Sequence, residues 1–409
     1  MVASFPPLTL RETIWTKLRR GYATNRFANP HYSRASGPGP QVMGSPPTVA
    51  LTSTAPSGLT KSLNAVSSPG AFYLTGGDSY TYASVGMRFP VTTITNGGSN
   101  GNVTNGRNSV GWRVKLQVDA IAPAFQLLNN STFYRFLVDG QHVSAAGLTA
   151  TNGGFNNFFQ LTFSTRQRRQ IWVEGDQAAA FDNVLVGPTE SVQPDPSGLT
   201  MMVFGDSITA ATSTGVVVPG LNDGFAYVLG DCFGVGDLRS SGSGGEGVLN
   251  PANTGAAYTL IQRLPYDARK ADVYLVAMGT NDISYTSAQQ TSAMFGVISY
   301  LRSNYPATPV IVLGCPGNSS GPSAATISCE NAFAAAVTQW GDANNVLFIP
   351  VSTSTNPMIS GTGKFGATNS TGNSDLYVGS DGTHPTAAGH AYWGVWLADA
   401  IYTAISVLP

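Results

Sequence analysis

The sequence has few charged residues: 21 Lys and Arg and 22 Asp and Glu, or 11% of its 409 residues, where an ordinary soluble domain has about 25%. The formal net charge of -1 gives no reason to expect nucleic acid binding. No run of eighteen apolar residues occurs, so neither a membrane-spanning helix nor a membrane partner is expected. Arg11 and Lys17 stand where a signal peptide has its apolar region, so no signal peptide is evident. The 47 glycines and the low charge are typical of loop-rich, β-rich proteins that work outside the cytoplasm or on a virus particle.

Cysteine and histidine are also scarce. Cys315 and Cys329 bracket a loop rich in Gly, Ser and Pro and could form a disulfide, which would leave Cys232 free. Three buried thiols are the alternative. The four histidines are His31, His142, His384 and His390. No Cys or His cluster has the spacing of metal ligands, so we expect neither a metal nor another cofactor.

Residues 1–70 read as a basic leader followed by a linker. Within the leader, Leu10, Ile14 and Leu18 recur at helical spacing and predict a short amphipathic helix over residues 9–20. Its basic face fits either a docking arm for an assembly partner or a solvated leader. From residue 36 to 70, Pro, Gly, Ser and Thr dominate without a sustained apolar period, which is typical of a linker.

Residues 71–192 have the alternating pattern of β-strands. Apolar and polar residues alternate from Trp112 to Asp119, which predicts a strand with one buried and one wet face. Asp139-Gly140 is a strong hairpin signal. Further strands are expected over Phe133–Val138, Phe158–Phe163, Gln170–Val173 and Asn183–Val186. We therefore predict an antiparallel β-sandwich domain of the jelly-roll type.

Residues 199–407 have a βα pattern. A linker over residues 192–198 precedes them, where two prolines are expected to prevent both helix and ladder pairing. Continuous apolar runs predict buried parallel strands, and stretches of helical period lie between and after them. The strands are expected at 201–204, 273–278, 310–313 and 346–351, and the helices near 256–265, 287–302, 326–341 and 386–405. This alternation predicts a three-layer, flavodoxin-like α/β domain.

Four short polar segments of the α/β domain carry the groups that acyl transfer to a serine needs. Ser207, in Gly205-Asp206-Ser207, follows the first strand at the sheet edge where ligands bind. His384 follows Asp381 by three residues in a turn, so the carboxylate can orient the imidazole toward a serine. Each segment alone is also typical of an ordinary turn, and only their occurrence together favours catalysis.

The segments Gly-Asp-Ser, Gly242-Ser243-Gly244-Gly245, Gly279-Thr280-Asn281-Asp282 and Asp381-Gly382-Thr383-His384-Pro385 occur in one order, and the chain resembles the SGNH (GDSL-type) hydrolases over about residues 199 to 407. The resemblance implies a catalytic triad of Ser207, His384 and Asp381, with an oxyanion hole formed by Ser207, Gly245 and Asn281. The sequence departs from the family where Gly244-Gly245-Glu246 replaces the common Ser-Gly-Asp. Gly244 and Gly242 are therefore alternatives to Gly245. His390 is expected to be a surface or packing residue.

These features predict a serine esterase. The order of a β-sandwich before the hydrolase domain resembles two-domain carbohydrate acetylesterases, which implies removal of a short acyl group, acetyl, from an acylated carbohydrate. Two alternatives stay open. One is a lipolytic esterase that acts on longer acyl esters and needs an apolar groove. The other is a structural or adhesion protein, such as a virus tail component, with a hydrolase-like domain.

Overall fold

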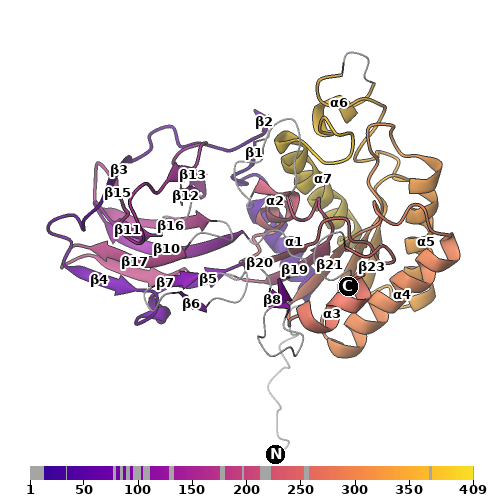
Figure 1. The fold of residues 1–409 in the computed structure, drawn as a ribbon, viewed down its shortest axis with the longest axis horizontal. Coiled ribbons are helices and arrows are strands. Elements are labelled where there is room, and N and C mark those ends of the chain that lie inside the picture. The colour runs from indigo at the N-terminus through magenta and orange to yellow at the C-terminus, as the bar shows by residue number, and fades with distance from the viewer. Residues whose placement is uncertain are drawn as a thin grey trace, which may run out of the picture.

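The computed structural model shows two side-by-side parts, a β-sandwich and an α/β unit (Figure 1). It describes residues 13–33, 35–76, 80–82, 86–88, 93–94, 103–104, 111–128, 133–175, 180–195, 198–211, 223–252, 258–367 and 371–408. Within these ranges, no helix is long and apolar enough to cross a membrane.

The sandwich consists of two antiparallel sheets. One has the order β13-β12-β16-β10-β18, with β14 beside β12 and β5 beside β10; the other has the order β3-β15-β11-β17-β7-β6, with β4 beside β17. Their inner faces enclose an apolar core that includes Trp112, Phe125 and Phe136. The strands of the first sheet are β5 (Tyr73–Thr75), β10 (Trp112–Ala120), β12 (Phe133–Val138), β13 (Gln141–His142), β14 (Leu148–Thr149), β16 (Gln167–Gly175) and β18 (Ser191–Pro194). Those of the second are β3 (Thr48–Thr52), β4 (Lys61–Asn64), β6 (Tyr80–Tyr82), β7 (Gly86–Arg88), β11 (Ala124–Leu127), β15 (Phe158–Thr162) and β17 (Ala180–Val186).

Asp139-Gly140 forms the predicted hairpin turn between β12 and β13. Asp139 has φ 50° and Gly140 φ 81°, and Val138 pairs with Gln141. Two consecutive positive φ values match the twist of a two-residue hairpin.

Only part of the polar face of strand β10 is exposed, whereas the sequence predicts a wet face along the whole strand: Gln117 and Asp119 are half-buried, and the first part of the face is covered. Arg113 and Lys115 are buried because the α/β unit covers this end of the strand: Arg113 pairs with Asp231, and the Lys115 ammonium donates to the carbonyl of Gly236. Alternation identified the two faces correctly, but sequence alone could not show that a second unit covers the polar one.

The predicted linkers contain strands. β3 pairs with β15 and β4 pairs with β17, although they lie within residues 36–70. β18 includes Pro194, which pairs with Leu116 of β10. Pro194 is tolerated because β18 is an edge strand, where the missing N–H is not needed.

The α/β unit has a five-stranded parallel sheet of order β20-β19-β21-β22-β23. The strands are β19 (Thr200–Gly205), β20 (Asp237–Gly242), β21 (Val273–Ala277), β22 (Val310–Leu313) and β23 (Val346–Ile349). Alternate residues of β19 enter opposite cores: Met201 and Val203 one, Met202 and Phe204 the other. The sheet is therefore buried on both faces, as the continuous apolar runs predict.

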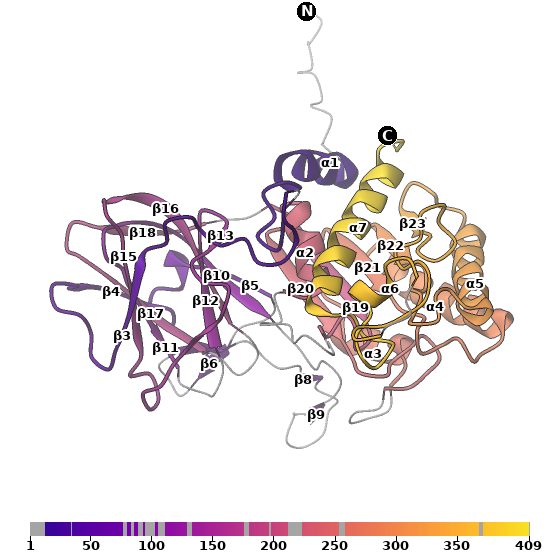
Figure 2. The ribbon, with the colours of Figure 1, turned by 90° about the horizontal axis from the view of Figure 1, so that it is seen from above.

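Helices cover both faces of this sheet (Figure 2). α1 (Ile14–Asn25), α2 (Phe225–Cys232) and α7 (Ala387–Ile405) share one core, whereas α3 (Leu260–Asp267), α4 (Ser287–Asn304) and α5 (Ala324–Trp340) share the other. The remaining short elements are β1 (Tyr32–Ser33), β2 (Gly37–Pro38), β8 (Thr93–Ile94), β9 (Val103–Thr104), the 3-10 turn η1 (Pro69–Ala71) and α6 (Ser374–Tyr377).

The leader helix lies further along the chain than predicted, and one of its faces is buried. α1 begins at Ile14, capped by the Thr13 side chain, and buries Trp15 and Leu18 against the α/β core. The Trp15 indole N–H donates to the carbonyl of Asn344 at 2.7 Å. The helix is thus an integral part of the α/β unit.

Candidate active site

Ser207 lies directly after β19, at the carboxyl edge of the parallel sheet. The Asp206 carboxylate accepts the N–H of Ile208 at 2.9 Å, and the N–H of Ala210 donates to the Asp206 carbonyl at 3.0 Å. These bonds close a tight turn around Ser207. Within the described residues, no acceptor takes the N–H of Ser207, so this donor is available to a substrate oxygen.

A relay of hydrogen bonds links Ser207 to a histidine and a carboxylate. The distance from Ser207 Oγ to His384 Nε2 is 2.8 Å, and that from His384 Nδ1 to Asp381 Oδ2 is 2.5 Å. The second carboxylate oxygen, Oδ1, accepts the N–H groups of Thr383 and His384 at 2.9 and 3.0 Å. Asp381 therefore fixes both the turn and the ring of His384.

This turn is itself held by the chain on either side of it. Gly379 donates its N–H to the carbonyl of His384 at 2.6 Å, and Val378 forms an antiparallel bridge with Pro385. Thr386 then caps α7 through its side chain. Gly382, at φ 82°, occupies the left-handed region that favours glycine.

The three candidate glycines after β20 have different surroundings. Gly242 is buried, and a Cβ there would lie 2.2 Å from the backbone N of Ala210, so it packs against the serine turn. Gly245 is partly exposed and has φ 72°. Neither Gly244 nor Gly245 donates its N–H to any described residue. Burial thus argues against Gly242 as an oxyanion donor, and Gly244 and Gly245 stay possible.

Asn281 joins this glycine loop to the segment after β21. Its Nδ2 donates to the Glu246 carbonyl at 2.9 Å, which leaves the second amide hydrogen available. Asp282 anchors the loop further: its carboxylate accepts the N–H groups of Val248, Leu249 and Asn250 at 2.8, 2.9 and 3.0 Å.

Asp282 belongs to the site, although the sequence predicts no role for it other than in a turn. The signal that points to Asp282 is its position, as a second polar residue directly after Asn281. Burial raises the pKa of Asp282, and the three backbone N–H donors oppose that rise.

Glu246, which stands where the family commonly has Asp, forms a buried ion pair in this structure. The Glu246 carboxylate is buried and pairs with Arg263, through Nε at 2.9 Å and through Nη2 at 2.6 Å. Arg263 also pairs with Asp267 at 2.6 Å. Glu246 therefore ties the glycine loop to α3.

The other singled-out histidines and cysteines lie elsewhere. His390 is buried in α7, where Nδ1 accepts the N–H of Phe225 at 3.3 Å, as a packing residue would. Cys232, Cys315 and Cys329 are unpaired and buried.

Spacing did not indicate that His31 and His142 would meet. Together with Glu174 they form a buried group whose ligand atoms lie within 4.8 Å of one another. Both Glu174 oxygens already accept from guanidinium groups, those of Arg113 and Arg135 at 2.7 Å each. A cation here would adjoin two positive charges, and we assign no metal to it.

Comparisons with known proteins identify a matching family model and structures of similar fold. Residues 203–392 match the model of the GDSL-like Lipase/Acylhydrolase family. No curated protein sequence matches the chain. Among solved structures, a salicylyl-acyltransferase from a tetracycline biosynthetic pathway has 15% identity and a TM-score of 0.61, over 87% of this chain and 99% of that one.

Two carbohydrate esterases share the fold. A family two carbohydrate esterase from Clostridium thermocellum, in complex with cellohexaose, has 17% identity and a TM-score of 0.55, over 82% of this chain and 99% of that one. An acetyl xylan esterase from Butyrivibrio proteoclasticus has 13% identity and a TM-score of 0.50, over 88% and 99%. The chain is thus an ester hydrolase whose α/β unit, containing Ser207 and His384, belongs to the SGNH (GDSL-type) hydrolases.

Proposed function

We propose that the chain removes a short acyl group, acetyl, from an acylated carbohydrate through a Ser207-His384-Asp381 triad. The observation that carries the proposal is the relay from Ser207 Oγ to His384 Nε2 at 2.8 Å and from His384 Nδ1 to Asp381 at 2.5 Å. A serine and a histidine at this separation are within reach for proton transfer.

In the proposed reaction, Ser207 Oγ attacks the ester carbonyl carbon while His384 Nε2 accepts the hydroxyl proton. The ionised Asp381 stabilises the imidazolium that forms. The carbonyl oxygen becomes an oxyanion, and the N–H groups of Ser207 and Gly245 with Nδ2 of Asn281 are the proposed donors. His384 then gives its proton to the leaving alcohol, and water hydrolyses the acyl-serine by the same steps.

The carbohydrate part of the proposal is supported by the two-domain carbohydrate esterases of similar fold and by the low charge of the chain. The acetyl part is supported by the small volume, about 20 Å³, of a pocket lined by Ile208, the residue after Ser207, and by Thr383, the residue before His384. A lipolytic enzyme would need a longer apolar groove.

Ser207→Ala is expected to lower aryl acetate hydrolysis by at least about 10³-fold while the melting temperature stays close to that of the parent, because the nucleophile is lost and the core is untouched. A fluorophosphonate probe should label the parent and not the variant. Labelling that persists in Ser207→Ala would assign the nucleophile elsewhere.

The carbohydrate is tested separately by acetate release from acetylated xylan and from acetylated cello-oligosaccharides, with Ser207→Ala as the blank. Acetate release from at least one of these carbohydrates, at a rate comparable with aryl acetate hydrolysis, is expected. If the protein hydrolyses aryl acetates but releases no acetate from either carbohydrate, it is an esterase and the proposal of a carbohydrate substrate is wrong.

A further inference from the structure

A small surface pocket lies between the three parts of the candidate site. It is lined by Ile208, Thr280 and Thr383, which are the chain neighbours of Ser207, Asn281 and His384. Pro316 and Ile283 also line this pocket and add apolar surface to it. An acyl group attached to Ser207 Oγ is expected to reach this pocket, because residues directly adjacent in the chain to the nucleophile, to the proposed oxyanion donor and to the proposed base all line it.

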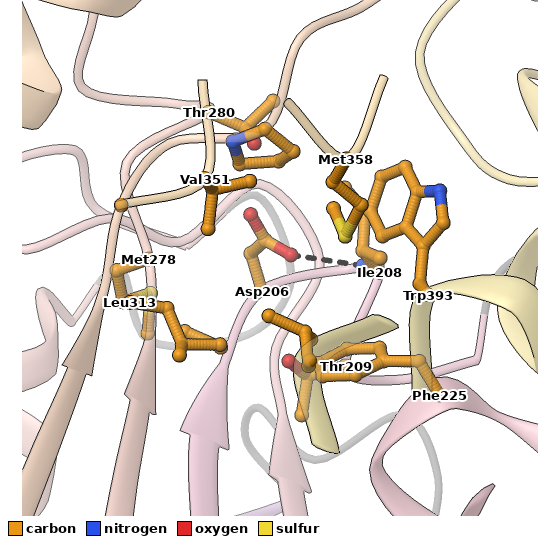
Figure 3. Close-up of a pocket in the computed structure, with 14 residues that line it drawn as sticks. Asp206, Ile208, Thr209, Phe225, Met278, Thr280, Leu313, Val351, Met358 and Trp393 are labelled. Atoms are coloured by element: carbon orange, nitrogen blue, oxygen red, sulfur yellow. Dashed lines mark hydrogen bonds between the residues drawn. The ribbon is translucent and has the colours of Figure 1, made fainter. Parts of the chain in front are cut away.

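A second cavity, named the inner cavity here for its lining of core residues, adjoins the pocket. Met278, Leu313, Val351, Met358 and Trp393 surround it (Figure 3), and its volume is about 30 Å³. These side chains are at most 3% exposed, so residues of the apolar core line this cavity. It has room for about two water-sized groups.

The pocket and the inner cavity share three lining residues, Ile208, Thr280 and Pro316. These residues therefore form the wall between the two spaces. Ile208 is 4% exposed and belongs to the apolar core, and its N–H is fixed by Asp206. Shortening its side chain would open the wall while the backbone bond that shapes the serine turn is kept.

We propose that the surface pocket is the acyl site, that the wall of Ile208, Thr280 and Pro316 restricts it to acetyl, and that the inner cavity is the space a longer acyl chain gains when the wall is opened. The inference rests on the proposed function, which it deepens by naming what sets acyl length. A pocket that must exclude added methylenes discriminates by about 10–200-fold per methylene.

The test compares kcat/KM for p-nitrophenyl acetate, butyrate and hexanoate. The parent should prefer acetate over butyrate by at least about tenfold. Ile208→Ala should lower that preference by about tenfold, and Ile208→Val should shift it in the same direction by less. Adding Val351→Ile to Ile208→Ala, which places one methylene in the inner cavity, should restore part of the acetate preference.

Ile349→Ala is the matched control, since Ile349 is equally buried in the same core but lines neither space. It should leave the preference unchanged. A parent that hydrolyses the three esters equally well, or a preference in both Ile208 variants that equals that of the parent, would overturn the acyl wall while leaving the esterase intact. A parent that hydrolyses none of the three esters contradicts the proposed function itself, and the acyl wall with it.

Discussion

Asp282 shows how much of the candidate site depends on one fully buried carboxylate. It accepts three consecutive backbone N–H groups of the loop after β20, and a Cβ on Gly247 would lie 2.2 Å from its Oδ1. The loop therefore packs against Asp282 without space for a side chain. Two proposed oxyanion donors lie next to these contacts: Gly245 shortly before the three residues that donate to Asp282, and Asn281 directly before Asp282 in the chain.

Asp282→Ala is expected to lower kcat by about 10- to 100-fold with a smaller change in KM, because displaced oxyanion donors weaken the transition state more than substrate binding. Asp282→Asn, which keeps one acceptor oxygen, should lose less. Asp272→Ala is the control, since Asp272 also accepts a backbone N–H, that of Thr200, at the opposite end of the sheet. A lower melting temperature with unchanged kcat would make Asp282 a purely structural residue.

Asp206 contributes to the pH dependence of stability. Burial raises the pKa of its carboxyl to about 7, well above the ordinary value of 3.8. Between these values the folded chain keeps a proton that the unfolded chain releases, so stability is greatest below about pH 4 and declines until about pH 7. Asp206→Asn removes this contribution. The melting temperature of the parent minus that of the variant should decline from pH 4 to pH 7 and be constant above; parallel pH profiles would contradict the raised pKa.

At the scale of elements, α1 illustrates a helix whose role its own sequence does not reveal. The 3.6-residue period predicts a helix near residues 9–20 but does not show what it packs against. Trp15 and Leu18 pack on the core that α7 also enters, and Arg26 pairs with Asp399 of α7 at 2.6 Å. These partners lie more than 300 residues away, and no local pattern identifies them.

Trp15→Ala should lower the free energy of unfolding by about 3–5 kcal/mol, because a buried indole and its hydrogen bond to Asn344 are lost. Thr24→Ala, on the exposed face of the same helix, is the control and should change it by less than about 0.5 kcal/mol. Thermal unfolding of both variants decides the point. Equal melting temperatures would mean that α1 does not stabilise the α/β unit.

The difference between local sequence patterns and contacts with distant segments explains which elements could be predicted. Continuous apolar runs identified β19, β21, β22 and β23, but β20, with the sequence DLRSSG, has no such run and was missed. The triad candidates were found because their motifs are local. Asp282 and the strands β3 and β4 were missed because hydrogen bonds to distant segments define them.

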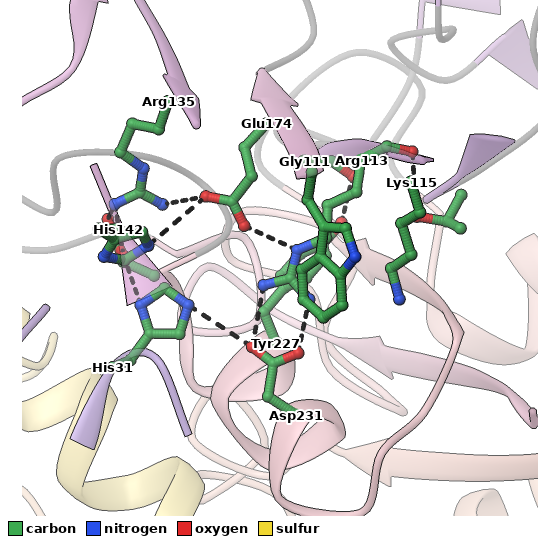
Figure 4. A network of polar contacts seen from close by, with 12 residues as sticks. His31, Gly111, Arg113, Lys115, Arg135, His142, Glu174, Tyr227 and Asp231 are labelled. Carbon is green, nitrogen blue, oxygen red and sulfur yellow. Dashed lines mark hydrogen bonds and ion pairs between the residues drawn. The ribbon is translucent and has the colours of Figure 1, made fainter. Parts of the chain in front are cut away.

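At the scale of the whole molecule, buried charges join the sandwich to the α/β unit (Figure 4). Arg135 of β12 pairs with both oxygens of Asp223, at 2.8 and 2.7 Å, and with Glu174 at 2.7 Å. Arg113 of β10 pairs with Glu174 and with Asp231 of α2. Burial alone would raise the pKa of Glu174, but the two guanidinium groups hold it at about 2. The sandwich thus supplies the countercharges of two carboxylates that belong to the α/β unit.

This arrangement predicts that the two units unfold together. Arg135→Met leaves Glu174 and Asp223 short of a partner in a buried place, and removing one member of a buried pair costs about 3–5 kcal/mol. Arg166→Met, which breaks the exposed pair with Asp119, should leave the melting temperature close to that of the parent, because water screens an exposed ion pair. Asp223→Asn in the Arg135→Met background should recover part of the lost stability, because the unpaired charge is removed.

Calorimetry of the parent should show one cooperative transition, which Arg135→Met moves far more than Arg166→Met does. Two separate transitions in the parent, with neither displaced by Arg135→Met, would mean that the sandwich is an independent module and that its charges do not stabilise the α/β unit.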